Sequence, residues 1–157
     1  MEENQMELFQ VSKYLDVEHT IAKYMFDPVE NPWEVLPSIS IFIEQLGPML
    51  PSEEFEQRGS NVWISKSAVI APTAYIGGPC IIDAGTEVRH CAFIRGSAII
   101  RKNCVIGNST EVKNSIIFDE VQIPHYNYVG DSILGFRSHL GAGAITSNVK
   151  NDKSNVE

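Results

Sequence analysis

The feature that most constrains the fold is a branched aliphatic residue that recurs every six positions along the middle of the chain. Two residues before each of these stands a second residue, which is almost always small. The aliphatic positions are Ile64, Ile70, Ile76, Ile82, Val88, Ile94, Ile100, Ile106 and Val112, and the preceding ones are Val62, Ala68, Ala74, Cys80, Thr86, Ala92, Ala98, Cys104 and Thr110. This segment is therefore a hexapeptide repeat.

A period of six favours strands over helices. A helix with about 3.6 residues per turn would carry these positions around its whole surface, whereas residues i and i−2 of a strand lie on one face. Branched residues suit the pleated surface of a strand. The small partner indicates an interior so narrow that one large and one small side chain fill it, as in a β-solenoid. Three six-residue sides close one triangular coil, so residues 18 apart should stack about 4.8 Å from each other on consecutive coils.

Residues 1–60 have a different composition. They carry 12 acidic and 3 basic side chains, whereas residues 61–157 carry 8 and 9, and they hold five of the eight prolines. The segment SISIFIEQLGP offers Ser38 as a helix N-cap and Gly47 as part of a stop signal. We therefore expect short helices and loops here.

Three segments follow from this division. Residues 1–60 should form a helical arm that caps the first coil, whose edge would otherwise present unpaired backbone groups. Residues 61–149 should form the β-helix, and residues 150–157 a polar tail at the place where further coils would continue.

Charge and composition exclude several classes. A net charge of −8 argues against nonspecific binding to nucleic acid or anionic membranes. No apolar run approaches the length of about 18 residues that a membrane helix needs, so we expect a cytoplasmic protein without a membrane anchor. The cysteines Cys80, Cys91 and Cys104 show no metal-binding spacing. Cys80 and Cys104 fall on the small inward positions and should be core thiols.

Arg95 and Lys113 are predicted to stack on consecutive coils. They are 18 residues apart and each follows an inward residue, so both side chains should point outward in one column. Adjacent like charges gain nothing for stability, so such a pair either spreads into solvent or holds a shared anion such as phosphate. The geometry leaves both interpretations open.

His125 lies in the segment VQIPHYNYVGDS, where the rhythm slips. After Val112 the inward positions pass through Ile117 or Phe118, Ile123 and Val129, and they slip again near Leu134 and Leu140. We interpret the slip as a bulge that re-aims His125 toward the cations. A histidine is well suited to accept a proton near neutral pH, and a surface or capping histidine is the alternative.

Four segments make a family resemblance specific: VKNS, IPHYNYVGD, VGDS and HLGAGAITSN. With the spacing of Arg95, Lys113, His125, Tyr128 and Asn148, they resemble the acetyltransferase domain of the bifunctional N-acetylglucosamine-1-phosphate uridyltransferases. The resemblance covers about residues 60–150 and is closest to stand-alone relatives without the nucleotidyltransferase domain. Residues 1–60 lack a glycine-rich nucleotide loop, so we do not expect this chain to make a UDP-sugar.

The resemblance implies an all-β fold, a single-stranded left-handed parallel β-helix with a short N-terminal helical arm, assembled as a homotrimer with sites between neighbouring β-helices. It implies a coenzyme A-dependent acetyltransferase that moves an acetyl group from acetyl-CoA to an amino-sugar phosphate such as glucosamine-1-phosphate. A positioned base and main-chain donors suit that reaction, since the amine loses a proton as it attacks and the intermediate carries negative charge.

The resemblance also gives each residue a role. His125 corresponds to the catalytic base. Arg95, Lys113, Tyr128, His139 and Asn148 correspond to substrate-binding residues. Gly141, Ala142 and Gly143 form the turn whose Ala142 amide faces the acyl group. No metal ligands are implied.

Three departures from the family bear on this assignment. His139 replaces an asparagine, Val149 replaces an aromatic residue, and the family continues past the position of Glu157 through coils that build much of the coenzyme A site. Two alternatives therefore stay open. One is a noncatalytic phospho-sugar-binding or assembly module. The other is a metal-dependent hydratase, which the wide spacing of His90, His125 and His139 disfavours.

Overall fold

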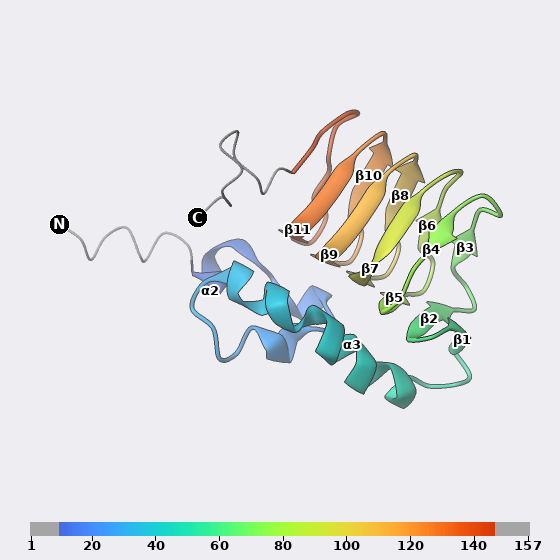
Figure 1. The fold of residues 1–157 in the computed structure, drawn as a ribbon. Helices are drawn as coiled ribbons and strands as arrows, with labels where there is room; N and C mark the ends of the chain where they lie inside the picture. The colour runs from blue at the N-terminus through green and yellow to red at the C-terminus, as the bar shows by residue number, and fades with distance from the viewer. Residues whose placement is uncertain (1–9, 147–157) are drawn as a thin grey trace.

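A computed structural model describes residues 10–146, which form a short helical arm followed by a parallel β-helix (Figure 1). The arm contains α2 (Val11–Tyr14), η2 (Val17–His19), η3 (Lys23–Met25), η4 (Pro32–Ser38), α3 (Ile39–Leu46) and η5 (Gly47–Met49). The strands are β1 (Phe55–Gly59), β2 (Val62–Ser65), β3 (Val69–Ile70), β4 (Tyr75–Ile76), β5 (Cys80–Ile82), β6 (Glu87–Val88), β7 (Phe93–Ile100), β8 (Val105–Asn108), β9 (Glu111–Ile117), β10 (Gln122–His125) and β11 (Tyr128–Leu134). None of the helices in this range is long and apolar enough to cross a membrane.

The strands stack coil upon coil in two sheets. One sheet has the order β1-β2-β5-β7-β9-β11, with β4 also paired to β7, and the other has the order β10-β8-β6-β3. The long strand β7 continues around a corner of the triangle, so its first residues pair with β4 and its last residues pair with β5. The pairing from β2 onward is parallel. This confirms the predicted all-β class and parallel β-helix, whereas the left hand remains a prediction from the resemblance.

The repeat positions fill the interior as predicted. The inward aliphatic residues from Ile82 to Val112 are almost completely inaccessible to solvent, and so are the small residues that precede them, including Cys80 and Cys104. Ile70 and Ile76 are half-buried and pack against this core from the first coil. The hexapeptide pattern thus correctly identified which side chains point inward.

The slip in the repeat lies at a different place from the one predicted. Strand β7 pairs with β9 as Ile94↔Val112 and then as Gly96↔Lys113, so the register shift falls at Arg95 and shortens the following coils from 18 residues to 17. Strand β10 keeps an unshifted parallel register with β8 up to its last residue, His125. The predicted bulge at His125 is therefore wrong. The prediction failed because a coil that is one residue shorter changes the spacing of the inward positions only further along the chain, after the shift itself.

The arm packs against one side of the β-helix. The outward positions of this side, which we call the arm face, are apolar on successive coils: Trp63, Ile81, Ile99, Ile116 and Ile133. Helix α3 lies along this face in Figure 1, and its Ile39 and Ile43 are fully buried there. Burying an isoleucine side chain contributes about 1.5–3 kcal/mol, so this contact is a main source of stability for the arm.

A second contact fixes the start of the arm to later coils. The His19 ring stacks on Phe136 at 3.5 Å, and its Nδ1 lies 3.4 Å from Asp119 Oδ2. The main chain adds a hydrogen bond of 3.0 Å from the Asp119 N–H to the His19 carbonyl. Phe26 packs edge-on against the fully buried Phe118. The arm therefore runs along several coils instead of sitting on the end of the first one.

The edge of the first coil is covered on one side by β1. This strand pairs antiparallel with β2, and Glu56 lies opposite Ile64. It carries an ion pair, since Arg58 Nε lies 2.5 Å from Glu56 Oε1. The sequence predicts helices in this role and places residues 55–59 within the arm. We attribute the difference to the short, polar sequence of β1, which lacks the repeat.

Candidate functional site

The predicted site residues surround a second side of the β-helix. Its outward positions are Tyr75, Phe93, Glu111 and Tyr128, and we call it the tyrosine face. The corner that follows these strand segments along the chain carries Arg95 after Phe93 and Lys113 after Glu111, and we call it the cation corner. The corner that precedes them carries His125, and we call it the histidine corner.

At the cation corner each basic side chain has a carboxylate partner. Arg95 Nη1 donates to Glu111 Oε1 at 2.8 Å, and Lys113 Nζ lies 3.0 Å from Asp131 Oδ2. Asn114 Nδ2 donates to the other oxygen of Asp131 at 2.8 Å. The hydrogen bond to Glu111 raises the pKa of Arg95, and the electrostatic interaction with Asp131 adds to the effect. The ladder pairs Lys113 with Gly96 and leaves Arg95 at the register shift, so the two cations lie on consecutive coils at one corner and each has its own carboxylate partner.

Tyr128 extends toward the same corner. It points outward because its neighbours Asn127 and Val129 are buried inside the coil. A Cβ atom at Gly130 would lie 2.5 Å from the Tyr128 hydroxyl oxygen, so the phenol lies across that glycine. Gly130 pairs with Lys113 in the ladder. The structure therefore brings together Tyr128, Lys113 and Arg95.

At the histidine corner, His125 is exposed at the end of β10, and the Nδ1 atom of its ring contacts a neighbouring side chain. His125 Nδ1 lies 3.3 Å from the Oδ1 atom of Asn108, its ladder partner on the previous coil. An amide oxygen accepts and does not donate, so this contact favours the tautomer that carries the proton on Nδ1. The Nε2 atom of that tautomer has a lone pair and can accept a proton.

The turn at Gly141–Gly143 is held beside His125. The Gly143 N–H donates to the His125 carbonyl oxygen at 3.1 Å, and Gly143 has a φ of +74°, which glycine adopts without strain. Ala142 follows His125 by one 17-residue coil and is exposed. Within residues 10–146, the Ala142 N–H forms no hydrogen bond. The predicted base and the predicted acyl-facing amide thus occupy neighbouring coils of one corner.

Asn127, which the sequence analysis did not single out, connects these two parts. Its side chain is 3% exposed and occupies the inward column of Ala74, Ala92 and Thr110. Its Oδ1 accepts from the His125 N–H at 3.1 Å, while its Nδ2 donates to the carbonyl oxygens of Gly141 at 2.7 Å and Ala144 at 3.3 Å. An amide at a position otherwise held by Ala or Thr was the signal that could have revealed it.

Two further predicted residues lie apart from these groups. His139 is exposed and pairs with Gln122 of β10, on the side that leads to the histidine corner. Asn148 lies outside the described residues. The structure therefore assembles His125 with the Gly141–Gly143 turn at one corner and Arg95, Lys113 and Tyr128 at the other.

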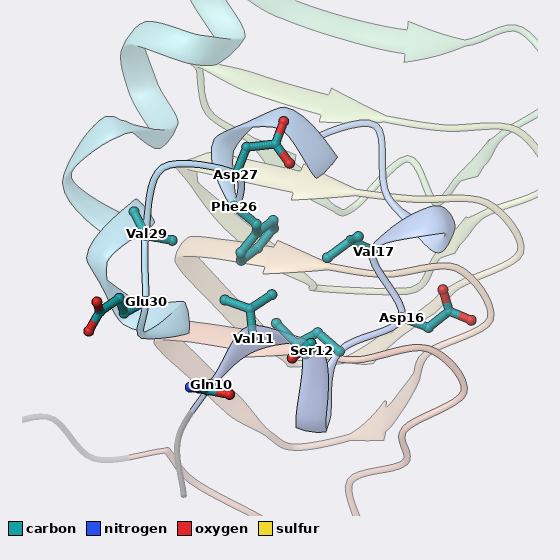
Figure 2. A pocket seen from close by; sticks show the side chains of 10 residues that line it. Gln10, Val11, Ser12, Asp16, Val17, Phe26, Asp27, Val29 and Glu30 are labelled. Carbon is teal, nitrogen blue, oxygen red and sulfur yellow. The ribbon is translucent and has the colours of Figure 1, made fainter. Parts of the chain in front are cut away.

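The arm contains a pocket of about 750 Å³ (Figure 2). Its described lining is apolar at Val11, Val17, Phe26 and Val29, and it carries the carboxylates Asp16, Asp27 and Glu30. These negative charges are unfavourable for an anionic sugar phosphate. Within the part of the chain that the structure describes, no group of three or more His, Cys, Asp and Glu side chains has a metal-binding arrangement.

Comparison with known proteins agrees with this architecture. The family model described as the GMPPB C-terminal domain matches residues 76–151. The Bifunctional protein GlmU of Methanococcus maripaludis is 38% identical over 137 residues, which are 85% of this chain and 33% of the relative. GlmU of Methanocaldococcus jannaschii is 32% identical over 134 residues, or 84% and 33% of the two chains. GlmU of Nostoc sp. is 37% identical over 95 residues, or 60% and 19%.

The coils and the repeat define the chain as a hexapeptide-repeat β-helix protein. More particularly, it is a homologue of the GlmU proteins, and the predicted resemblance to their acetyltransferase region is confirmed. The chain spans about a third of the length of the archaeal relatives it matches. The four segments and the residue spacing therefore predicted the right group of relatives.

Proposed function

We propose that this chain is an acetyltransferase that moves an acetyl group from acetyl-CoA to the amine of a sugar phosphate such as glucosamine-1-phosphate, with His125 as general base. The observation that carries the proposal is the contact of His125 Nδ1 with Asn108 at 3.3 Å. It favours the neutral tautomer whose Nε2 can take a proton from the attacking amine.

The turn beside His125 fits the acyl group of the donor. The unused Ala142 N–H is available to the thioester oxygen, which gains negative charge when the amine attacks. Cβ atoms placed at Gly141 or Gly143 would meet no atom of residues 10–146 within 4 Å, so this described part of the chain leaves the surface open to an approaching ligand. Acetyl-CoA supplies the activated acetyl group, and this chain supplies the base and the hydrogen-bond donor.

The cation corner is compatible with the phosphate group although each cation already has a partner. Arg95 uses one nitrogen for Glu111, and a guanidinium carries five N–H groups in all. The Lys113 ammonium likewise has three donors. Glu111 and Asp131 would repel the phosphate, so we expect binding that depends on both cations and is weakened by these carboxylates.

A neighbouring copy would complete the site, and we include a homotrimer in the proposal. The tyrosine face leaves large apolar side chains in solvent, with Tyr75 61% and Ile145 70% exposed. Tyr75 and Phe93 pack edge-on at 5.4 Å and form one apolar surface. A copy seated on this face would exclude water from the space between the two corners.

The direct test measures N-acetylated product by mass spectrometry after incubation with acetyl-CoA and a panel of amino-sugar phosphates. We expect His125→Ala to lower kcat about 10²- to 10⁴-fold, as for loss of a general base, while the oligomer measured by light scattering persists. Asn108→Ala should keep the base but lose its orientation, which predicts a smaller loss of kcat and an altered pH profile. Full activity of His125→Ala would refute the assignment.

The phosphate contact has its own pair of variants. Lys113→Ala should raise the KM for the sugar phosphate with little change in kcat. Glu111→Gln removes a competing negative charge without changing the size of the side chain and should lower the KM. Equal KM values in both variants and the parent protein would place the phosphate elsewhere.

The second candidate function is a noncatalytic phospho-sugar-binding module. The ion pairs of Arg95 with Glu111 and of Lys113 with Asp131 favour this candidate, because they fix the positions of the two cations when no substrate is bound. Calorimetry separates the two candidates. A module binds the sugar phosphate and gives no acetylated product, whereas the enzyme shows both.

A further inference from the structure

A second reactive cluster lies at the histidine corner, on an earlier coil. Cys91 Sγ lies 3.3 Å from Nε2 of His90, and Nδ1 of the same ring lies 2.7 Å from the Thr73 hydroxyl oxygen. The Cys91 N–H also donates to that hydroxyl oxygen at 3.1 Å. His90 precedes Asn108 by one coil, and Asn108 precedes His125 by one more. The cluster is therefore distinct from the proposed acetylation site but shares its edge.

Cys91 differs from the other cysteines in its surroundings. Cys80 and Cys104 are buried in the coil, where burial raises the pKa of each thiol to about 12 and keeps it protonated. Cys91 is exposed on the corner, where its φ is +56°. The repeat explains the two buried thiols as small inward residues and gives no packing reason for the third.

The hydrogen bonds favour removal of the Cys91 proton. The Thr73 oxygen has two lone pairs, so it can accept from the Cys91 N–H and from His90 Nδ1–H together. His90 Nε2 is then an acceptor for the Cys91 thiol proton, and the resulting imidazolium keeps both of its N–H donors satisfied. The nearest charged side chain in the sequence, Arg89, is paired with Glu87 at 3.0 Å. A nucleophile, an adjacent base and a group that orients the base are thus present.

We propose that Cys91 is a covalent modification site for small-molecule disulfides, activated by His90 and oriented by Thr73. His90 takes the thiol proton and the Cys91 thiolate attacks one sulfur of the disulfide. A new S–S bond joins Cys91 to that half, and the other half leaves as a thiolate that regains the proton. The disulfide is the oxidant, so no further co-reactant is needed. The product is a mixed disulfide on the corner two coils before His125.

The test treats the native full chain with oxidised glutathione or with the chromogenic disulfide DTNB and locates the adduct by peptide mass spectrometry. We expect one adduct, on Cys91, and none in Cys91→Ser. At pH 7 His90→Asn should react about tenfold more slowly, because an unassisted thiol is only a few per cent ionised there. The difference should shrink toward pH 10, where a thiol ionises without a base.

Two controls distinguish activation from a change in folding. Thr73→Val keeps His90 but removes its orienting hydroxyl, so it should react more slowly than the parent and faster than His90→Asn. In guanidinium chloride all three cysteines are accessible, and the parent and His90→Asn should then react at equal rates. Three results would each overturn the proposal. They are equal rates for the native parent and native His90→Asn at pH 7, no reaction at Cys91 of the native protein, and adducts mainly on Cys80 or Cys104.

Discussion

Replacing Asn127 with alanine should destabilise the protein and loosen the proposed active site at once. The substitution removes three hydrogen bonds, one from the His125 N–H and two to the carbonyl oxygens of Gly141 and Ala144. A buried group left without a partner costs about 1–3 kcal/mol. The carbonyl oxygens of Gly141 and Ala144 each keep a main-chain N–H partner at 3.2 Å, so the unpaired His125 N–H dominates and we expect a total loss of about 1–3 kcal/mol. For a chain of this size that corresponds to a fall in Tm of about 2–12 °C.

Circular dichroism during thermal and urea unfolding measures this loss. Asn127→Thr is the matched control, because it places the residue type of Thr110 in the same inward column but cannot reach the Gly141 turn. If the amide holds the corner, both variants lose stability and the Gly143 N–H exchanges with deuterium faster in each. If Asn127 only fills space, Asn127→Thr should match the parent protein, and that result would refute the reasoning.

Two further predictions concern the core. Ile99→Ala on the arm face should cost about 2–5 kcal/mol in urea unfolding, because the side chain is fully buried, whereas Val69→Ala at an exposed position should cost under about 0.5 kcal/mol. The thiols of Cys80 and Cys104 have pKa values raised from 9.0 to about 12 by burial, so the stability they contribute is present below pH 9 and is lost as pH rises toward 12. Cys80→Ala should flatten that decline in unfolding experiments between pH 8.5 and 10.5.

The interior of the β-helix could be predicted because one physical constraint repeats along the chain. Each coil must place a large and a small side chain inside, so the spacing from Ile64 to Val112 is enough to identify the core. The coil length follows from the same constraint. Its change from 18 to 17 residues could be detected but was assigned to the wrong place, since pairing between coils decides which residue is lost.

The arm contact was also present in the sequence, in a weaker form. Ile81, Ile99 and Ile116 each lie directly before an inward residue, so they point outward and need a cover. This second column marks the face on which α3 packs. The cover itself could not be found from spacing, because a helix that packs across several coils has no counterpart in the six-residue period.

The candidate site was predicted in part. Arg95 and Lys113 lie at one corner on consecutive coils, with Tyr128 directed toward them. His125 lies at the other corner beside the Gly141–Gly143 turn and is not aimed at the cations, as it was expected to be. The carboxylates of Glu111 and Asp131 were missed. The prediction considered only the two cations that follow each other from coil to coil, and not the acidic residues beside them. Such neighbours depend on side-chain direction at a corner, which the repeat does not specify.

The antiparallel strand β1 has a consequence for how these molecules meet in solution. A parallel β-helix adds coils by stacking strands that run in one direction, and an uncovered first coil would invite the last coil of another molecule to continue it. β1 runs the opposite way and carries the charged pair Glu56 and Arg58. A second molecule that approaches this side cannot continue the parallel stacking, because β1 runs antiparallel. It would also have to desolvate two charged side chains, and both effects oppose growth of the protein into end-to-end fibres.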